Sequence, residues 1–290
     1  MLYYFLRYDT IKLYSIKGVL FLKNTNEYLK QLLTIEWNGK PVWKSIRDGE
    51  LTFSPAFKGT LYDKASVKIM YVGHAVNGWA EFTETACPSL EKTIDTILNQ
   101  QGALDTFVNQ DGYPYIKSNG KTGVYRHINS KFFRLIKQIL EYQNESDSPT
   151  TEDTWYNDKK NWNQKFIWSN LYCIAPSNGG NPKNDFIKSG MSQYIELIKA
   201  QIEEYKPNVV IFCPLSGYFT PWKRLPSFAD ILDSYKPYEN SSTIIATGHI
   251  DQTQIIVCKR PDARGKSFKN YEDVQKMAKE ISDYINSVCK

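Results

Sequence analysis

The sequence predicts an α/β fold of three layers, α/β/α, in which a mostly parallel central sheet carries helices on both faces. From residue 67 to the end, β-rich runs alternate with stretches of helical periodicity, a pattern typical of parallel sheets with crossover helices. The run at 209–212 is continuously apolar, which suits a strand covered on both faces. The chain of 290 residues fits a single domain, 1–290, with residues 1–60 as an N-terminal elaboration.

Local patterns place the individual elements. Runs of high β propensity predict strands at 67–72, 166–174, 208–213, 243–247 and 254–258. Apolar residues at helical spacing predict helices at 24–35, 89–100, 129–142, 185–205 and 271–288. Asp251-Gln252 is expected in a hairpin-like turn between the last two strands. Residues 102–123, rich in Gly, Asn, Asp and Tyr, are expected to form a loop.

Composition narrows the classes of partner. The formal net charge of +5, from 36 basic and 31 acidic residues, permits an anionic partner such as nucleic acid without requiring one. The five cysteines form no CxxC pair, so neither a disulfide framework nor a zinc site is expected. Cys173, Cys213 and Cys258 lie in apolar runs and are expected to be buried, as suits a reducing cytoplasm. We expect no metal, no cofactor and no membrane partner, because the three His are scattered and no apolar run is long enough.

The segment after the first strand is the first place to look for a site, because ligands bind outside the carboxyl ends of strands in such sheets. It reads Gly73-His74-Ala75-Val76-Asn77-Gly78. Two glycines allow a tight turn and a close approach to a ligand, and His74 and Asn77 add polar side chains. The segment is neither a Walker A loop nor a GxGxxG motif. An ordinary strand-to-helix turn is the alternative interpretation.

Two later strands also lead into polar residues. Asn170 lies in a largely apolar stretch, where a buried amide must find partners. It either satisfies backbone groups or reads the amide edge of a ligand. After the last strand a basic loop is suited to phosphate contacts, with a solvated surface loop as the alternative; its residues are Arg260, Arg264, Lys266 and Ser267.

Four motifs, in order, resemble those of the uracil-DNA glycosylase superfamily. Gly73 to Asn77 stands where that superfamily has Gly-Gln-Asp-Pro-Tyr or a related motif. Residues 125–133, Tyr-Arg-His-Ile-Asn-Ser-Lys-Phe-Phe, resemble the Phe-Ala-His-Pro-Ala-Asn-Arg-Phe-Trp stretch of the mismatch-specific branch. Ser169-Asn170-Leu171 matches the strand whose Asn reads the base, and Arg260-Pro261 matches the His-Pro motif that clamps the DNA backbone. The resemblance covers residues 67–268.

The resemblance implies base excision in DNA repair, that is, hydrolysis of the N-glycosidic bond of uracil or another damaged base. DNA or a nucleotide would be the partner, and the cytoplasm the compartment. Gly73, Ala75, Tyr125 and Asn170 would contact the base, Tyr125 by stacking and Asn170 by an edge hydrogen bond. Phosphates would be held by Arg260, Arg264, Lys266 and Ser267.

The catalytic position departs from the superfamily's pattern. Its water-activating Asp or Asn falls at Ala75, which cannot polarise water, and Val76 and Arg260 replace its Pro and its closing His. Asn77 is therefore the first candidate for the catalytic polar group and His74 the second. The alternative is a catalytically inactive protein that binds a nucleotide or nucleic acid. A small-molecule hydrolase is disfavoured, because no Gly-x-Ser-x-Gly elbow occurs.

Overall fold

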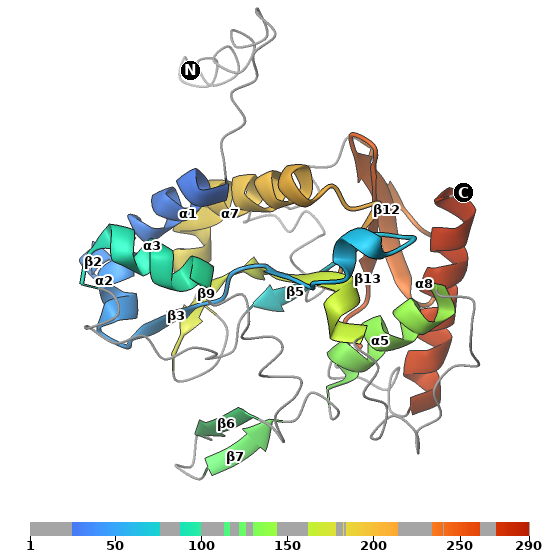
Figure 1. The fold of residues 1–290 in the computed structure, drawn as a ribbon, viewed down its shortest axis with the longest axis horizontal. Coiled ribbons are helices and arrows are strands. Elements are labelled where there is room, and N and C mark those ends of the chain that lie inside the picture. The colour runs from blue at the N-terminus through green and yellow to red at the C-terminus, as the bar shows by residue number, and fades with distance from the viewer. Residues whose placement is uncertain are drawn as a thin grey trace, which may run out of the picture.

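A seven-stranded mixed sheet forms the centre of the molecule (Figure 1). The computed structural model describes residues 25–75, 88–99, 113–116, 122–125, 130–143, 162–177, 182, 184–213, 234–239, 241–261 and 271–289. The strands of the sheet are β4 (Phe57–Lys58), β5 (Ile69–Ala75), β8 (Phe166–Tyr172), β10 (Val209–Phe212), β11 (Lys236–Pro237), β12 (Ile244–Ile250) and β13 (Thr253–Cys258). Their order across the sheet is β11-β12-β13-β10-β5-β8-β4.

The four central strands are parallel, as the sequence predicts. β5 pairs with both β10 and β8, and β10 pairs with β13. In chain order this arrangement reads 2-1-3-4, a doubly wound order in which ligands bind where the order reverses, between the first and third strands. Here those strands are β5 and β10. The edge strands β4, β11 and β12 pair antiparallel with their neighbours. Of these three, the sequence predicts only β12, which forms a hairpin with β13. The hairpin turns at Asp251, where φ is +48°.

Helices form where apolar residues recur at helical spacing. They are α1 (Thr25–Leu33), α2 (Val42–Arg47), α3 (Leu90–Leu98), α5 (Lys131–Gln143), α7 (Asn184–Tyr205) and α8 (Tyr271–Val288). All but α2 lie within about two residues of the expected ranges. The side chain of Ser89 caps α3 by accepting a hydrogen bond from the backbone N–H of Lys92, which satisfies one of the free donors at the helix start.

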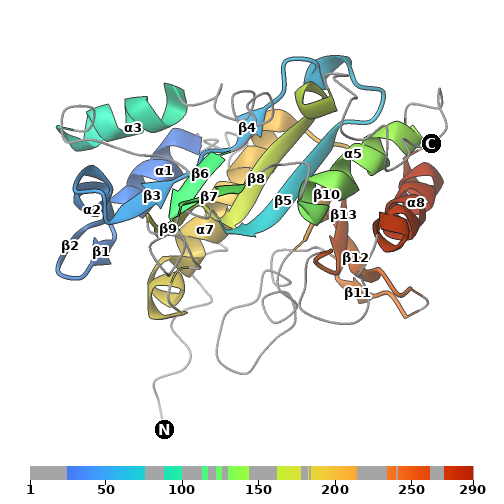
Figure 2. The same ribbon diagram turned by 90° about the horizontal axis from the view of Figure 1, so that it is seen from below.

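Alternate residues of the central strands divide the core into two halves. Met70 and Val72 of β5 pack in one cluster with residues of α1, α3 and α7. Ile69 and Tyr71 point to the other face and pack with residues of α5 and α8. Figure 2 shows α5 and α8 on the opposite side of the sheet from α1 and α7. The sheet is therefore covered on both faces, which explains why its central strands read as continuous apolar runs.

Short strands are the main feature that the sequence patterns do not predict. β1 (Glu36–Trp37) and β2 (Lys40–Pro41) form a hairpin around Asn38 and Gly39, whose φ angles of +49° and +79° are those of a two-residue hairpin turn. β3 (Leu51–Phe53) pairs with β9 (Ile174–Pro176). The prediction of a loop at 102–123 is wrong in part, because Tyr113–Ile116 (β6) pairs with Thr122–Tyr125 (β7). In the described ranges, no helix is both long and apolar enough to cross a membrane.

Candidate functional site

The carboxyl ends of β5 and β8 bring Gly73 and Asn170 together. The two residues are direct partners in the parallel ladder. A Cβ built on Gly73 would lie 2.6 Å from Oδ1 of Asn170 and 3.2 Å from Cζ of Phe132. The first distance is too short for any methyl group, and the second is tight. Gly73 is therefore required for close approach rather than for an unusual backbone angle, and the space beside its Cα is filled by an amide and an aromatic ring.

Asn170 is a buried amide whose nitrogen has no hydrogen-bond partner among the described residues. Its side chain is 5% exposed, and Nδ2 finds no acceptor anywhere in the part of the chain that the structure describes. An unsatisfied buried donor of this kind costs about 1–3 kcal/mol. Other buried side chains of the described chain, such as Gln138, share this state; what distinguishes Asn170 is its place at the carboxyl end of a central strand. A carbonyl oxygen of a ligand within hydrogen-bonding distance of Nδ2 would remove this cost. The alternative, in which the Asn170 side chain hydrogen-bonds to backbone groups, does not account for the missing acceptor at Nδ2 in the described chain.

Phe132 is an aromatic residue of the site that the sequence does not single out. Its ring lies 4.3 Å from the ring of Tyr71, centroid to centroid, at 34°. The Tyr71 hydroxyl donates a hydrogen bond of 3.1 Å to the carbonyl oxygen of Phe132. Helical periodicity predicts that Phe132 faces inward from its helix. That periodicity gives the side of a helix that faces the core, but not the strand end against which a ring packs.

His74 is buried in an aromatic environment at the same strand end. Its side chain is 4% exposed, and its ring stands nearly perpendicular to that of Tyr172, with centroids 5.2 Å apart. Tyr172 in turn packs edge-on against Tyr194 of α7 at 5.3 Å. Burial, and secondarily the positive charge of Arg260, lowers the pKa of His74 to about 3. The imidazole is therefore neutral at physiological pH.

Arg260 lies two residues beyond the end of β13. It is partly exposed, and it is close enough to His74 for its charge to contribute to the lowered pKa of that imidazole. The structure thus brings together Gly73, His74 and Asn170, with the charge of Arg260 nearby. Gly73 and His74 lie within the last three residues of β5, which continues to Ala75 beyond its expected end at residue 72, and Asn170 lies two residues before the end of β8. Only Arg260 follows a strand.

The remaining predicted site residues are not tested by the structure. Ala75 ends β5 and pairs with Tyr172, and an alanine carries no polar side-chain atom for activating water. Tyr125 ends β7, in a hairpin that stands apart from the seven-stranded sheet in Figure 1, and its side chain is outside the described part of the chain. The other predicted site residues lie wholly outside the described residues: Asn77, Arg264, Lys266 and Ser267.

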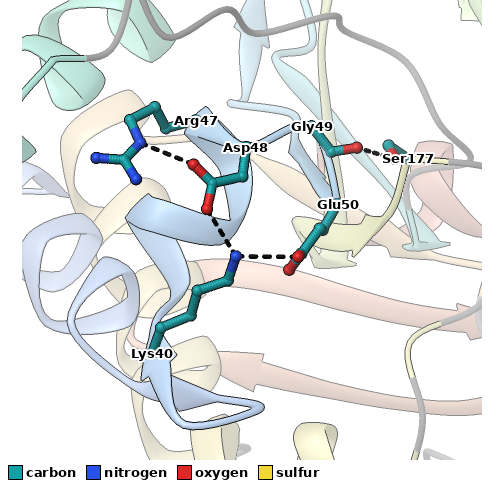
Figure 3. A network of polar contacts seen from close by, with 6 residues as sticks. All are labelled: Lys40, Arg47, Asp48, Gly49, Glu50 and Ser177. Carbon is teal, nitrogen blue, oxygen red and sulfur yellow. Dashed lines mark hydrogen bonds and ion pairs between the residues drawn. The ribbon is translucent and has the colours of Figure 1, made fainter.

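A second polar cluster lies away from this site, on the N-terminal segment (Figure 3). Nζ of Lys40 contacts Oδ2 of Asp48 at 2.6 Å and Oε1 of Glu50 at 2.9 Å, and Nε of Arg47 contacts the other Asp48 oxygen at 2.8 Å. The Ser177 hydroxyl donates a hydrogen bond to the carbonyl oxygen of Gly49. Lys40, followed by Arg47, lowers the pKa of Asp48. These charges pair with each other on the surface, and we interpret the cluster as a structural tie between α2 and the segment after β9.

Metal binding finds no support in the described part of the chain, where no three His, Cys, Asp or Glu residues gather into a possible metal site. In comparisons with known proteins, the chain matches neither a protein-family model nor a curated protein.

Proposed function

We propose that this protein is a three-layer α/β/α protein of uracil-DNA glycosylase type, which binds an extruded nucleobase against the amide nitrogen of Asn170, at the carboxyl ends of β5 and β8, and hydrolyses its N-glycosidic bond. One observation carries the proposal: the buried amide nitrogen of Asn170 has no acceptor within the described chain and lies at the carboxyl end of a central strand. This is the residue whose counterpart reads the base in the superfamily that the sequence resembles.

The chemistry of a carboxamide supports this choice of ligand. Asn offers a donor and an acceptor side by side, and uracil presents a carbonyl oxygen next to an N–H group. Oδ1 of Asn170 faces Gly73, so Nδ2 is the atom left to donate to the carbonyl oxygen. Cytosine carries an amino group at the corresponding position, which would place two donors against each other. We therefore assign uracil or another base with such a carbonyl as the substrate.

An aromatic stack would offset the cost of extruding the base. Flipping a base costs a few kcal/mol, and stacking on an aromatic ring is worth about 1–3 kcal/mol per base. Phe132 already lies beside Gly73 and Asn170, and we propose it as a ring on which the base rests, in addition to Tyr125. Arg260 supplies a positive charge at the same edge of the sheet, where a DNA phosphate would be held.

The reaction we propose breaks the bond between the sugar carbon and the base, which leaves with the electron pair. With a pKa of about 3, neutral His74 is too weak a base to take a proton from water at pH 7. It is suited instead to donating an N–H hydrogen bond to the departing base. Water then bonds to the sugar carbon and gives up a proton, which the departed base anion takes up to become the neutral base. Asn77 remains our first candidate for orienting that water.

A specific observation also favours the second candidate, a catalytically inactive binder of a nucleotide or nucleic acid. Ala75 stands where the superfamily's water-activating residue is expected, and an alanine cannot replace a carboxylate. Such a protein would keep the base contact of Asn170 and the charge of Arg260 while lacking hydrolysis.

A base-release assay on single- and double-stranded DNA containing uracil separates the two. Release by the wild-type protein that is lost in Asn170→Ala and Asn170→Asp supports the enzyme, since neither variant offers an amide N–H. His249→Gln is the control, because His249 pairs with Gln254 near the opposite end of β13, and it should keep full release. Uracil-dependent binding without release supports the second candidate. Absence of both release and binding would overturn the two together.

A further inference from the structure

Two buried cysteines lie side by side at the ends of adjacent parallel strands. Cys213 directly follows β10, and Cys258 is the last residue of β13. Phe212 and Val257 are partners in the ladder, so the two cysteines stand one step further along the same register. Both side chains are 0% exposed and belong to the same core cluster. Their Sγ atoms are 2.9 Å apart.

Each thiol also has an oxygen acceptor. Sγ of Cys213 donates to the Tyr71 hydroxyl at 3.3 Å, and Sγ of Cys258 donates to the carbonyl oxygen of Phe212 at 3.3 Å. A thiol has a single hydrogen, so when both bonds are made the two sulfur atoms face each other with no hydrogen between them. Neighbouring strands are about 4.8 Å apart, within the range of about 4.4–6.8 Å that Cα atoms of bridged cysteines span.

We propose that Cys213 and Cys258 are a redox-active dithiol that a hydroperoxide converts into a reversible intramolecular disulfide. One sulfur gives up its proton and, as thiolate, attacks the terminal peroxide oxygen, which breaks the O–O bond and gives a sulfenic acid. The other oxygen leaves with the bonding pair, takes up that proton and departs as water or alcohol. The second thiol then displaces hydroxide from that sulfur, and its proton completes a water molecule. The two sulfurs lose two electrons, which the peroxide gains. The sulfur atoms need to close from 2.9 Å to about 2.05 Å.

The surroundings distinguish this pair from the other cysteines of the described chain. Cys173 is buried in the other half of the core, and Cys289 lies near the C-terminal end of the chain, after α8. Burial raises the pKa of Cys258, as it does the pKa of Cys173 and of Cys289, so the neighbouring sulfur and not the pKa sets the pair apart. Because both thiols are buried, we expect them to react only when the strand ends open. The sulfenic acid then reacts with the neighbouring thiol, whose sulfur lies 2.9 Å away, before a second peroxide molecule reaches it. The pair joins β10 to β13 just before Arg260, at the edge of the sheet that bears the candidate site.

Peptide mapping of the wild-type protein tests the proposal. The protein is treated with hydrogen peroxide, its free thiols are alkylated in denaturant, and it is digested without reduction for mass spectrometry. We expect a linked pair of peptides containing Cys213 and Cys258, two hydrogens lighter than the sum of the free peptides, which dithiothreitol separates. Alkylation of both cysteines after peroxide treatment, conversion to sulfinic acid, or linkage to any other cysteine would overturn it.

Substitutions provide a matched comparison. Cys213→Ser and Cys258→Ser should each abolish the cross-link, whereas Cys173→Ser should retain it. A cross-link of the same mass that persists in Cys213→Ser would contradict the assignment. Because the experiment measures peptide masses, its result does not depend on whether the protein binds or cleaves DNA. If a variant does not fold, the peptide map of the wild-type protein still shows whether Cys213 and Cys258 are linked.

Discussion

The carboxamide of Asn170 lies against the backbone of Gly73, with Oδ1 2.6 Å from the position that a Cβ on Gly73 would occupy. This contact links the two central strands β5 and β8 at the carboxyl edge of the sheet, next to the point between β5 and β10 where the strand order reverses. It also fixes which atom of the amide remains available, because the oxygen is turned toward Gly73 and the nitrogen is left without an acceptor in the described chain. Changes at either residue of the pair should therefore have distinct effects on stability and on binding.

Gly73→Ala should destabilise the protein by about 1–3 kcal/mol, the usual cost of overpacking a core. The added methyl would meet Asn170 Oδ1 and the Phe132 ring, and the nearer of these belongs to a short, buried side chain. Urea unfolding measures the effect. The control is the double variant Gly73→Ala, Asn170→Ala: the second change removes the nearer obstacle and should restore part of the loss. Equal losses in the single and double variants would show that the two residues do not press on each other.

Asn170→Ala should leave the free energy of unfolding within about 1 kcal/mol of the wild type, because losing an unsatisfied buried donor offsets lost packing. The same change should weaken binding to uracil-containing DNA by about 5- to 150-fold, since a good base contact is worth about 1–3 kcal/mol. Fluorescence anisotropy and urea unfolding measure the two effects on one protein sample. A strongly destabilised variant would instead indicate that Asn170 has a structural role.

Lys40→Ala tests our interpretation that the charges of the polar cluster in Figure 3 pair with each other and take no part in binding. Lys40 is the first cause of the lowered pKa of Asp48, so its removal should raise that pKa toward the ordinary value of an aspartate. NMR titration of the Asp48 carboxyl group measures this shift. The midpoint of unfolding should change little, because exposed ion pairs contribute little to stability. Uracil-dependent binding should stay unchanged, and a loss of binding would place this cluster in the functional surface.

The sequence predicts the central elements of this fold better than its edges. β5, β8, β10 and β13 were predictable because each is a buried apolar run. β4 and β11 contain two residues each, and so short a segment has no periodicity to detect. The β6–β7 hairpin lies in a stretch rich in Gly, Asn and Asp, whose composition indicates a loop. Pairing with a neighbour, rather than local propensity, makes these segments strands.

The candidate site shows the same division. The proximity of Gly73 and Asn170 was predictable because both stand near the carboxyl ends of apolar parallel strands, and such strands end at one edge of the sheet. Phe132 and Tyr172 were not, because whether an aromatic residue of a core lies next to a site depends on which elements pack together. The apposition of Cys213 and Cys258 depends likewise on the order of strands, which places β10 beside β13 although 45 residues separate the two sulfur atoms along the chain.

The stability of the protein should fall as the pH is lowered through the range in which His74 is neutral only in the folded state. The pKa of His74 is about 3 in the folded protein, against an ordinary value of 6.5 that applies to the unfolded chain. Between these values the unfolded chain binds one proton more. The contribution of His74 to stability is therefore fully present above about pH 6.5 and declines toward pH 3 by up to about 1.4 kcal/mol per pH unit.

His74→Gln removes this contribution. Urea unfolding at pH 7.5 and pH 5 should therefore show a loss about 2 kcal/mol larger for the wild type than for the variant. Other titrating groups are common to both proteins and cancel in the comparison, so equal losses would mean that His74 is not held neutral by burial against Tyr172.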